Sequence, residues 1–313
     1  MTGARRLWVA AAFIAIAAVL GGITVFRRTA SLPADVSRSR AATTRSVLFA
    51  EIQPVRITDC DLQRFGEPHD GGYPLCANLL GRVKAGYSYG ISGYDGWGCD
   101  VSRRLRIRVH EYDCFDLREP SCPGGQTVFH GECIGTARAT QDGRPFDTLS
   151  SQFARNGDAA TPLVMKIDVE GAEWDAFLLA PDSALSQIEQ LDVEFHHVDD
   201  PDYVATIRRL KQFFHIAHLH YNNFGCDGAL APFPSWAFEV LLVNKRIATS
   251  DGSPAPATSA VDAPNDAKSA DCQTASRATP RIVGFIQGVH LSHTVRDWGW
   301  QGMDKERAGW RRQ

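Results

Sequence analysis

Asp168 and Glu170 are two acidic residues that directly follow a short apolar run beginning at Leu163. A run of this length predicts a buried parallel strand, and Gly171 permits the tight turn that would follow it. In open α/β sheets, ligands bind beyond the carboxyl ends of the strands, so both carboxylates would lie where a ligand is expected. Two buried acids are costly unless they bind or catalyse something. The structural alternative is that they cap a helix at 172–179, because acids favour the first helical turn.

A second apolar run, at 188–195, contains Glu194 near its end and is followed by His196. Side chains alternate along a strand, so Glu194 and His196 would share one face. With Asp168 at the end of the neighbouring strand, they would form a cluster of two carboxylates and one imidazole. His196, whose reference pKa is about 6.5, would then be a general base that takes a proton from a hydroxyl group. Asp168 or Glu194 would orient it, and His197 is the nearby alternative.

The same cluster allows two other interpretations. Asp168, Glu194 and His196 would in one of them bind a divalent metal, Mg²⁺ or Mn²⁺, that acidifies a hydroxyl group. In the other, His196 is a buried, hydrogen-bonded histidine without a chemical role. The sequence shows no metal-ligand spacing pattern, so it gives little support to a metal-dependent hydrolase. It also has no Cys-x-x-Cys pair that would indicate a structural zinc site.

Three further stretches are candidates for ligand binding. The run Asp70-Gly71-Gly72-Tyr73 predicts a tight turn. Gly90 and Gly93 lie at the end of a predicted strand, where glycine lets the backbone approach a ligand closely. Asp113 ends the next predicted strand, about 20 residues beyond the glycines, where nucleotide-binding folds hold ribose hydroxyls. Glu111 is the alternative acid on that strand.

Four of these stretches, taken in order, resemble the motifs of FkbM-type methyltransferases. They resemble still more closely the relatives of that family, the membrane-anchored methyltransferase-like proteins. The resemblance covers 64–246 and rests on Asp70-Gly71-Gly72-Tyr73, Tyr87-Ser88-Tyr89-Gly90-Ile91, Lys166-Ile167-Asp168-Val169-Glu170-Gly171-Ala172-Glu173 and Glu194-Phe195-His196. It implies an S-adenosylmethionine-dependent O-methyltransferase whose acceptor is a small molecule or a glycan with a free hydroxyl group.

The resemblance also implies roles for individual residues. His196, Asp168 and Glu194 would be catalytic. The cofactor-binding residues would be Asp70, Gly71, Gly72, Tyr73, Gly90, Gly93, Asp113, Asp168 and Glu170. Asp113 is favoured over Glu111 for the ribose, although Cys114 stands where the family often has proline. The alternative function is a non-catalytic, membrane-tethered binding module that keeps the methyltransferase fold, and the irregular glycine loop motivates it.

Strands alternate with helices from 87 to 243, which predicts an α/β fold with a Rossmann-like, doubly wound and mostly parallel sheet. The resemblance implies that this is the class I methyltransferase fold. The predicted strands lie at 87–91, 106–112, 127–134, 163–167, 188–195, 216–220 and 236–243. The predicted helices lie at 99–105, 146–156, 172–179 and 202–214. The segment at 47–62 is expected to form a first strand or a short helix.

The ends of the chain differ from this central region. The run at 7–26 contains 20 uncharged residues. As a helix it would span about 30 Å, the thickness of a bilayer core, so it predicts an N-terminal transmembrane anchor. Cleavage near Ala30 or Ala34 is the alternative. The full prediction is a tail at 1–6, the anchor at 7–26, a flexible stalk at 27–55, the methyltransferase domain at 56–246, a low-complexity linker at 247–280 and a tail of unknown role at 281–313.

Charge and cysteine content bear on partners and compartment. A net charge of −3 gives no support for nucleic-acid binding. Arginines lie on both sides of the predicted anchor, so the charge rule for membrane orientation does not decide which side carries the domain. Eight cysteines in an anchored protein indicate disulfides in an oxidising compartment. We therefore expect a single-pass membrane protein with its domain on the exported side.

Overall fold

The computed structural model describes residues 34–272. The predicted tail at 1–6, the anchor at 7–26 and the tail at 281–313 lie outside the described residues. Among the helices within 34–272, none combines the length and apolar character that a bilayer crossing requires.

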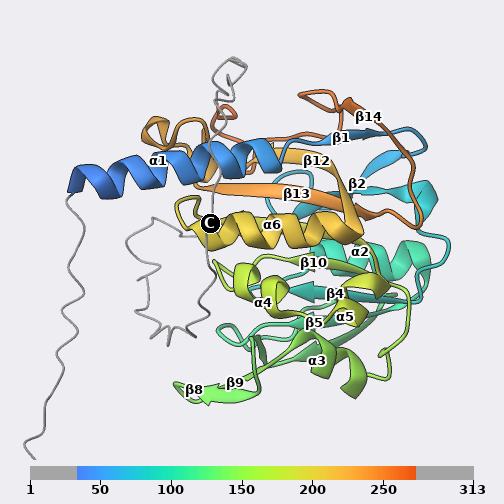
Figure 1. Ribbon diagram of the computed structural model, residues 1–313. Helices are drawn as coiled ribbons and strands as arrows, with labels where there is room; N and C mark the ends of the chain where they lie inside the picture. Colours follow the sequence, from blue (N-terminus) through green and yellow to red (C-terminus); the bar gives the residue numbers. More distant parts are fainter. Residues whose placement is uncertain (1–33, 273–313) are drawn as a thin grey trace, which may run out of the picture. The chain divides into compact units, whose positions relative to one another are not determined.

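A seven-stranded sheet forms the centre of the described region (Figure 1). From one edge to the other, its strands are β12 (Phe214–Tyr221), β13 (Ala237–Asn244), β11 (Ile188–His196), β10 (Leu163–Ile167), β4 (Ala85–Tyr89), β5 (Arg108–Tyr112) and β6 (Gln126–His130). Only β13 is antiparallel to its neighbours; the other contacts in the sheet are parallel. The predicted α/β class and the mostly parallel sheet are confirmed.

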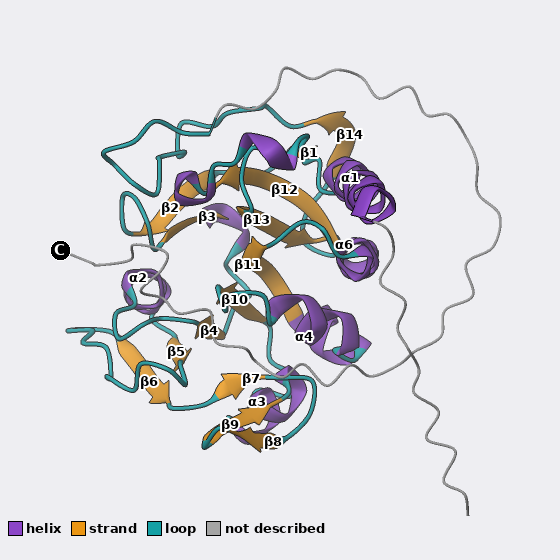
Figure 2. Cartoon of the chain, turned by 90° about the vertical axis from the view of Figure 1, so that its left-hand side faces the viewer, coloured by secondary structure: helices purple, strands orange, loops and turns teal. Residues whose placement is uncertain are grey.

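Helices cover both faces of this sheet, as the view in Figure 2 shows. One face packs against α1 (Ala34–Glu51), α3 (Leu149–Arg155), α4 (Glu173–Leu179), α5 (Asp182–Gln187) and α6 (Pro201–Phe213). The other face packs against α2 (Gly96–Leu105) and the hairpin of β2 (Leu62–Gly66) and β3 (Gly72–Cys76). Alternation along β11 explains the division, because Leu191, Val193 and Phe195 join the larger apolar core while Glu194 and His196 face the hairpin side.

The strand order reverses between β4 and β10. After β4 the chain continues through α2 to β5 on one side, whereas after β10 it continues through α4 and α5 to β11 on the other side. In sheets of this kind, a crevice for ligands opens at the carboxyl ends of the two strands where the order reverses. The residues that follow Tyr89 and Ile167 therefore occupy the favoured ligand position.

Several elements differ from the sequence prediction. The predicted third strand at 127–134 is divided, because β6 ends at His130 and β7 (Cys133–Ile134) belongs to a separate small sheet with β8 (Ala139–Gln141) and β9 (Arg144–Asp147). The predicted helix at 146–156 begins only at Leu149, where the Thr148 side chain caps it. In the Asp-Gly-Gly-Tyr stretch, Asp70 and Gly71 lie in the turn of the β2–β3 hairpin, and Gly72 and Tyr73 are the first residues of β3.

The predicted flexible stalk is helical from Ala34 to Glu51. Its sequence has no apolar period, but Leu48 is fully buried in the main core. Ion pairs join the helix to α6 and the preceding loop, with Arg45 Nη1 2.6 Å from Asp199 Oδ1 and Lys211 Nζ 2.7 Å from Glu51 Oε2. Tertiary contacts therefore order a segment whose local composition is typical of a linker.

The part of the predicted loose linker that the structure describes, 247–272, is ordered. Within it, β14 (Ser250–Pro254) pairs with β1 (Val55–Ile57), and the chain then continues across the carboxyl side of the sheet. We call residues 255–272 the closing segment. Its contacts are hydrogen bonds, ion pairs and one disulfide rather than a periodic apolar face, which explains why the sequence pattern did not predict its order.

All eight cysteines are paired in the structure. The disulfides are Cys60–Cys76, Cys99–Cys122, Cys114–Cys133 and Cys226–Cys272. Four disulfides in one domain are typical of exported proteins and indicate that this domain lies in an oxidising compartment. The last of them ties the closing segment to the domain.

These pairings predict the thiol content of the protein. Denatured, unreduced protein is expected to react with no equivalents of an alkylating reagent, because no cysteine is free. After reduction, all eight should react, and the mass increase on intact protein counts them. Labelling of any cysteine before reduction would contradict the pairing, and peptide mapping would identify which disulfide is missing.

Candidate active site

Three of the predicted site residues, Asp168, Glu170 and Glu194, gather around the imidazole of a fourth, His196, at the carboxyl ends of β10 and β11. The His196 side chain is 3% exposed, and its Nε2 lies 3.7 Å from Asp168 Oδ1 and 3.6 Å from Glu194 Oε1. Glu170 Oε2 is also 3.7 Å from the same nitrogen. The predicted cluster of acids and imidazole is therefore present in the fold, with Glu170 as a fourth member.

The opposite edge of the His196 ring contacts Glu173, which the sequence analysis did not assign to the site. Glu173 Oε1 lies 3.2 Å from His196 Nδ1 and accepts a hydrogen bond of 2.9 Å from the His196 backbone N–H. Its second oxygen accepts from the Gly171 N–H at 2.8 Å. The carboxylate is completely buried. Glu173 thus holds the ring so that Nε2 points at Asp168 and Glu194.

The alternative in which Asp168 and Glu170 cap the following helix is wrong. Helix α4 has Ala172 at its N-cap, without a side-chain capping bond. In this turn the backbone N–H of Gly171 donates instead to the carboxylate of Glu173. Glu170 adopts a left-handed conformation with φ of 60°. This conformation is uncommon for a non-glycine residue, and such residues concentrate at functional sites.

Surrounding charges determine the protonation of His196. Burial by itself lowers the pKa of this imidazole, but the carboxylates of Glu173, Glu194 and Asp168 outweigh burial and raise the pKa to about 10. Burial, together with the charge of Asp168, raises the pKa of Glu194 well above its usual range. His196 therefore carries both ring protons at neutral pH. It can act as the predicted general base only where another positive charge displaces the proton from Nε2.

Neutral and cationic groups hold the acids in place. Asn222 Nδ2 donates to Glu194 Oε1 at 2.8 Å, and the Tyr73 hydroxyl donates to Glu194 Oε2 at 3.3 Å. Lys166 Nζ lies 3.8 Å from Asp168 Oδ2 and donates to the backbone carbonyls that end β4. Alternation along β10 puts Lys166 and Asp168 on the same face as the β11 acids, which explains their convergence.

The Asp-Gly-Gly-Tyr turn contributes to the site mainly through the hairpin that it forms. Gly71 has a φ of 83°, and a Cβ at Gly72 would lie 1.8 Å from the Glu67 carbonyl oxygen, so the turn requires both glycines. Tyr73 is buried and directed at Glu194. Burial raises the pKa of Asp70, and the negative charge of Asp168 raises it further.

Asp113 connects the end of β5 to the loop after β4. Its Oδ2 accepts from the Ser92 N–H at 2.7 Å, while its Oδ1 accepts from the N–H groups of Phe115 and Asp116 at 2.8 and 3.0 Å. An ionised carboxylate offers about four lone-pair sites, so one site on Oδ2 remains for a ligand. Asp113 can therefore accept a hydrogen bond from one ribose hydroxyl.

The predicted glycines Gly90 and Gly93 serve close contacts within the protein. A Cβ on Gly90 would lie 1.6 Å from the Asp168 carbonyl oxygen, which shows how closely β4 and β10 approach at the strand-order reversal. A Cβ on Gly93 would lie 2.9 Å from Asp116 Oδ2. Both residues have positive φ angles, 73° and 74°. Side chains at either position would push apart the two loops that border the site.

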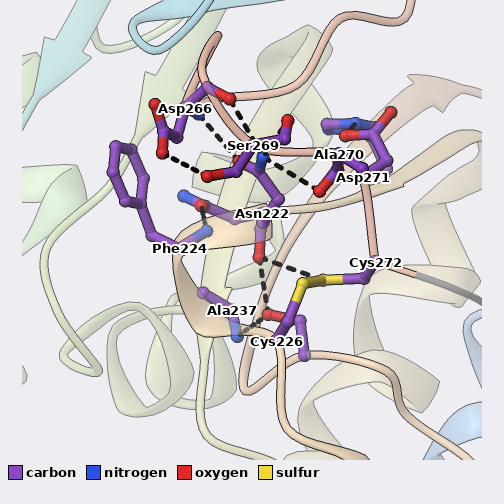
Figure 3. The surroundings of a disulfide bond; sticks show 12 residues. Asn222, Phe224, Cys226, Ala237, Asp266, Ser269, Ala270, Asp271 and Cys272 are labelled. Carbon is purple, nitrogen blue, oxygen red and sulfur yellow. Dashed lines mark hydrogen bonds and ion pairs between the residues drawn. A yellow bond between two sulfur atoms is a disulfide. The ribbon is translucent and has the colours of Figure 1, made fainter.

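The closing segment seals one side of the acid cluster. Asn265 is 4% exposed and donates to Glu239 Oε1 at 2.7 Å and to Asp70 Oδ1 at 3.5 Å. Glu239 lies directly opposite Glu194 in the β11–β13 pairing. The Cys226–Cys272 disulfide fastens the segment beside Asn222, and Asn223 Nδ2 donates to the backbone carbonyls of Asp266 and Ser269 (Figure 3). Asn222, the neighbour of Asn223, donates to Glu194, so this part of the chain contacts both the closing segment and the site.

Access to the cluster lies on the side of Asp168 and Glu170. Their side chains are 27% and 53% exposed, whereas those of Glu194, His196 and Glu173 are nearly or completely buried. Two cavities elsewhere, of about 650 and 330 Å³, are not lined by any of these residues. A substrate that reaches the cluster would therefore meet Glu170 and Asp168 first.

Comparison with known proteins adds no assignment, because neither a family model nor a curated protein matches the chain. A function for this protein is therefore inferred from its sequence motifs and from the geometry of the site.

Proposed function

We propose that the protein is an S-adenosylmethionine-dependent methyltransferase that methylates a hydroxyl oxygen on a glycan or another hydroxylated substrate. The observation that carries the proposal is the gathering of Asp168, Glu194 and His196 beside the strand-order reversal, with Asp113 on the adjacent strand end. The doubly wound sheet is the type that the resemblance to FkbM-type methyltransferases implies. Tethering to a membrane by the run at 7–26 is part of the same proposal.

The residues at this edge fit S-adenosylmethionine in two respects. The crevice between β4 and β10 is the position where doubly wound sheets bind nucleotide-like ligands. Asp113 stands at the end of β5, and its Oδ2 accepts from one backbone N–H, which leaves acceptor capacity for a single ribose hydroxyl. Bound there, S-adenosylmethionine would supply a methyl group on a sulfonium, an electrophile for in-line displacement.

The protein's own residues would prepare the acceptor. Asp168 is a partly exposed acid of the cluster, so it would orient the acceptor hydroxyl by accepting its hydrogen bond. In the overall reaction a carbon–oxygen bond forms, the carbon–sulfur bond breaks with its electron pair left on sulfur, and the hydroxyl proton passes to Asp168 and from there to solvent. Glu194 and His196 lie behind Asp168 and would receive the acceptor oxygen in a largely water-free environment.

One observation favours the second candidate, a binding module that keeps the fold without catalysis. Four carboxylates lie within 4 Å of the His196 ring nitrogens and raise its pKa to about 10, which favours the imidazolium form at neutral pH. An imidazolium cannot accept the hydroxyl proton. In this alternative the acid cluster and the imidazolium of His196 would stabilise the fold and bind a ligand without turnover.

A turnover assay separates the two candidates. Purified protein is incubated with S-adenosylmethionine and a panel of hydroxylated acceptors, and S-adenosylhomocysteine is measured. Methyl transfer is expected, and Asp168→Asn should lower its rate by about 10²- to 10⁴-fold, the usual contribution of a positioned acid–base group. The matched control is Asp142→Asn, which changes the same chemical group in an exposed turn. Donor binding without turnover of any acceptor would favour the binding module.

A further inference from the structure

The Nε2 edge of His196 has an unusual environment for a buried imidazole. The side chain is 3% exposed and Glu173 fixes its Nδ1 edge. Within 34–272, Nε2 lies 3.6 Å from a carboxylate oxygen of Glu194 and 3.7 Å from oxygens of Asp168 and Glu170. These distances exceed the range of an N–H to oxygen hydrogen bond. A nitrogen of a buried side chain is thus held by Glu173 on its far edge and surrounded by three carboxylates at longer than hydrogen-bond distance.

The spacing fits ligands that share an ion. Atoms bound at about 2.1 Å to one octahedral cation lie about 3.0 Å apart in adjacent positions and about 4.2 Å apart in opposite positions. The distances from His196 Nε2 to Asp168 and Glu194 fall between these values. Ligand atoms from Asp168, Glu194 and His196 all lie within 4.8 Å of one another. Movements of a few tenths of an ångström would therefore complete the coordination of a cation.

We infer that Asp168, Glu194 and His196 bind one divalent cation of the Mg²⁺ or Mn²⁺ class. Two carboxylates and one imidazole form a donor set dominated by hard oxygen atoms, which suits these ions. Asp168 is partly exposed, so the open side of the site can admit waters or a substrate oxygen.

The neighbouring residues support this assignment as positioning groups. A histidine that binds a metal through one nitrogen almost always donates its other N–H to a carboxylate or carbonyl, and Glu173 occupies that place. Asn222 and Tyr73 hold the Glu194 carboxylate by hydrogen bonds to both of its oxygens. Two of the three donors, His196 and Glu194, are thus prearranged by buried groups around them.

The negative charges around His196 also favour a bound cation. Four carboxylates, those of Asp168, Glu170, Glu173 and Glu194, lie within 4 Å of the His196 ring nitrogens. The nearest lysine, Lys166, is directed at backbone carbonyls and lies 3.8 Å from only one of these acids. A divalent cation would offset the remaining negative charge and would occupy the place of the Nε2 proton.

Cation binding at this site does not depend on the proposed function. A role of the bound cation in methyl transfer rests on the proposed function. There, an acceptor hydroxyl bound to the cation would lose its proton to solvent more readily, because the ion stabilises the alkoxide. The oxygen would then form its bond to the methyl carbon. This role removes the need for His196 to act as the base.

Titration of the full-length protein in detergent with Mn²⁺ tests the site directly. Free Mn²⁺ gives a strong electron paramagnetic resonance signal that is lost on binding, so the assay needs neither donor nor acceptor. We expect one ion per chain. Asp168→Asn and Glu194→Gln should each weaken binding by roughly 100-fold or more, and the positioning variant Glu173→Gln by about 10- to 100-fold.

Asp192→Asn is the matched control, because Asp192 is a buried acid on the same face of β11 that is not a member of the triad. It should bind Mn²⁺ as the unaltered protein does. Thermal melting checks that each variant is folded, and Mn²⁺ should raise the melting temperature only of proteins that bind it. Absence of binding by the folded unaltered protein, or equal binding by all variants, would overturn the inference. Binding without methyl transfer would retain the site and reject the proposed function.

Discussion

Replacing Glu173 by alanine is expected to lower the free energy of unfolding by about 3–5 kcal/mol, the usual cost of removing one partner of a buried ionic contact. The carboxylate is completely buried and accepts from the Gly171 N–H, the His196 N–H and the His196 ring. Alanine would leave all three donors without an acceptor in a site that water does not reach. Denaturant unfolding at neutral pH, followed by circular dichroism, measures the loss.

Asp175→Ala is the matched control for this prediction. Asp175 lies on the same short helix but has mainly like charges around it, and burial followed by Asp202 and Asp200 raises its pKa. Its removal should leave stability unchanged or slightly increased. Glu173→Gln should cost less than Glu173→Ala, because one oxygen still accepts from His196. Equal stabilities of the Glu173→Ala and Asp175→Ala proteins would show that Glu173 does not support the site.

Replacing Asp113 by asparagine is expected to weaken S-adenosylmethionine binding by roughly 10- to 150-fold. This range corresponds to one hydrogen bond to a charged group, worth about 1.5–3 kcal/mol. Oδ1 of Asp113 is saturated by two backbone amides, so only Oδ2 can contact the ribose. An amide nitrogen at the Oδ2 position would donate where the ribose hydroxyl must also donate. Isothermal titration calorimetry of both proteins measures the difference.

Asparagine keeps one oxygen for the amides of Phe115 and Asp116, so the loop at the end of β5 should remain folded. Asp142→Asn serves again as the control, since it makes the same chemical change in an exposed turn. Unchanged affinity in Asp113→Asn, together with binding by the unaltered protein, would remove Asp113 from the donor site. The purely structural role of joining two loops would then be its whole function.

The parts of the site that lie on strands could be predicted from the sequence. The apolar runs located β10 and β11, and the two-residue alternation put Glu194 and His196 on one face. Asp168 followed from its place after the first of these runs. These inferences succeed because parallel strands end at the same edge of a sheet, so local patterns specify a long-range arrangement.

Other parts of the site depend on contacts that the local sequence does not encode. An acid in the first turn of a helix usually faces solvent. Glu173 is in the first turn of α4, but it is buried there and contacts His196. The closing segment lacks an apolar period, and its order depends on partners such as Glu239 and on the Cys226–Cys272 disulfide. The protonation of His196 could not be predicted either, because it depends on how many carboxylates the fold brings around one ring.

Calorimetric titration of the purified protein with S-adenosylmethionine tests the central claim most directly. We predict one donor bound per chain with micromolar affinity, because the strand order reverses between β4 and β10, the place where doubly wound sheets bind nucleotide-like ligands. Failure of a protein with intact disulfides and cooperative melting to bind the donor would contradict the claim. The gathering of Asp168, Glu194 and His196 would then require a function other than methyl transfer.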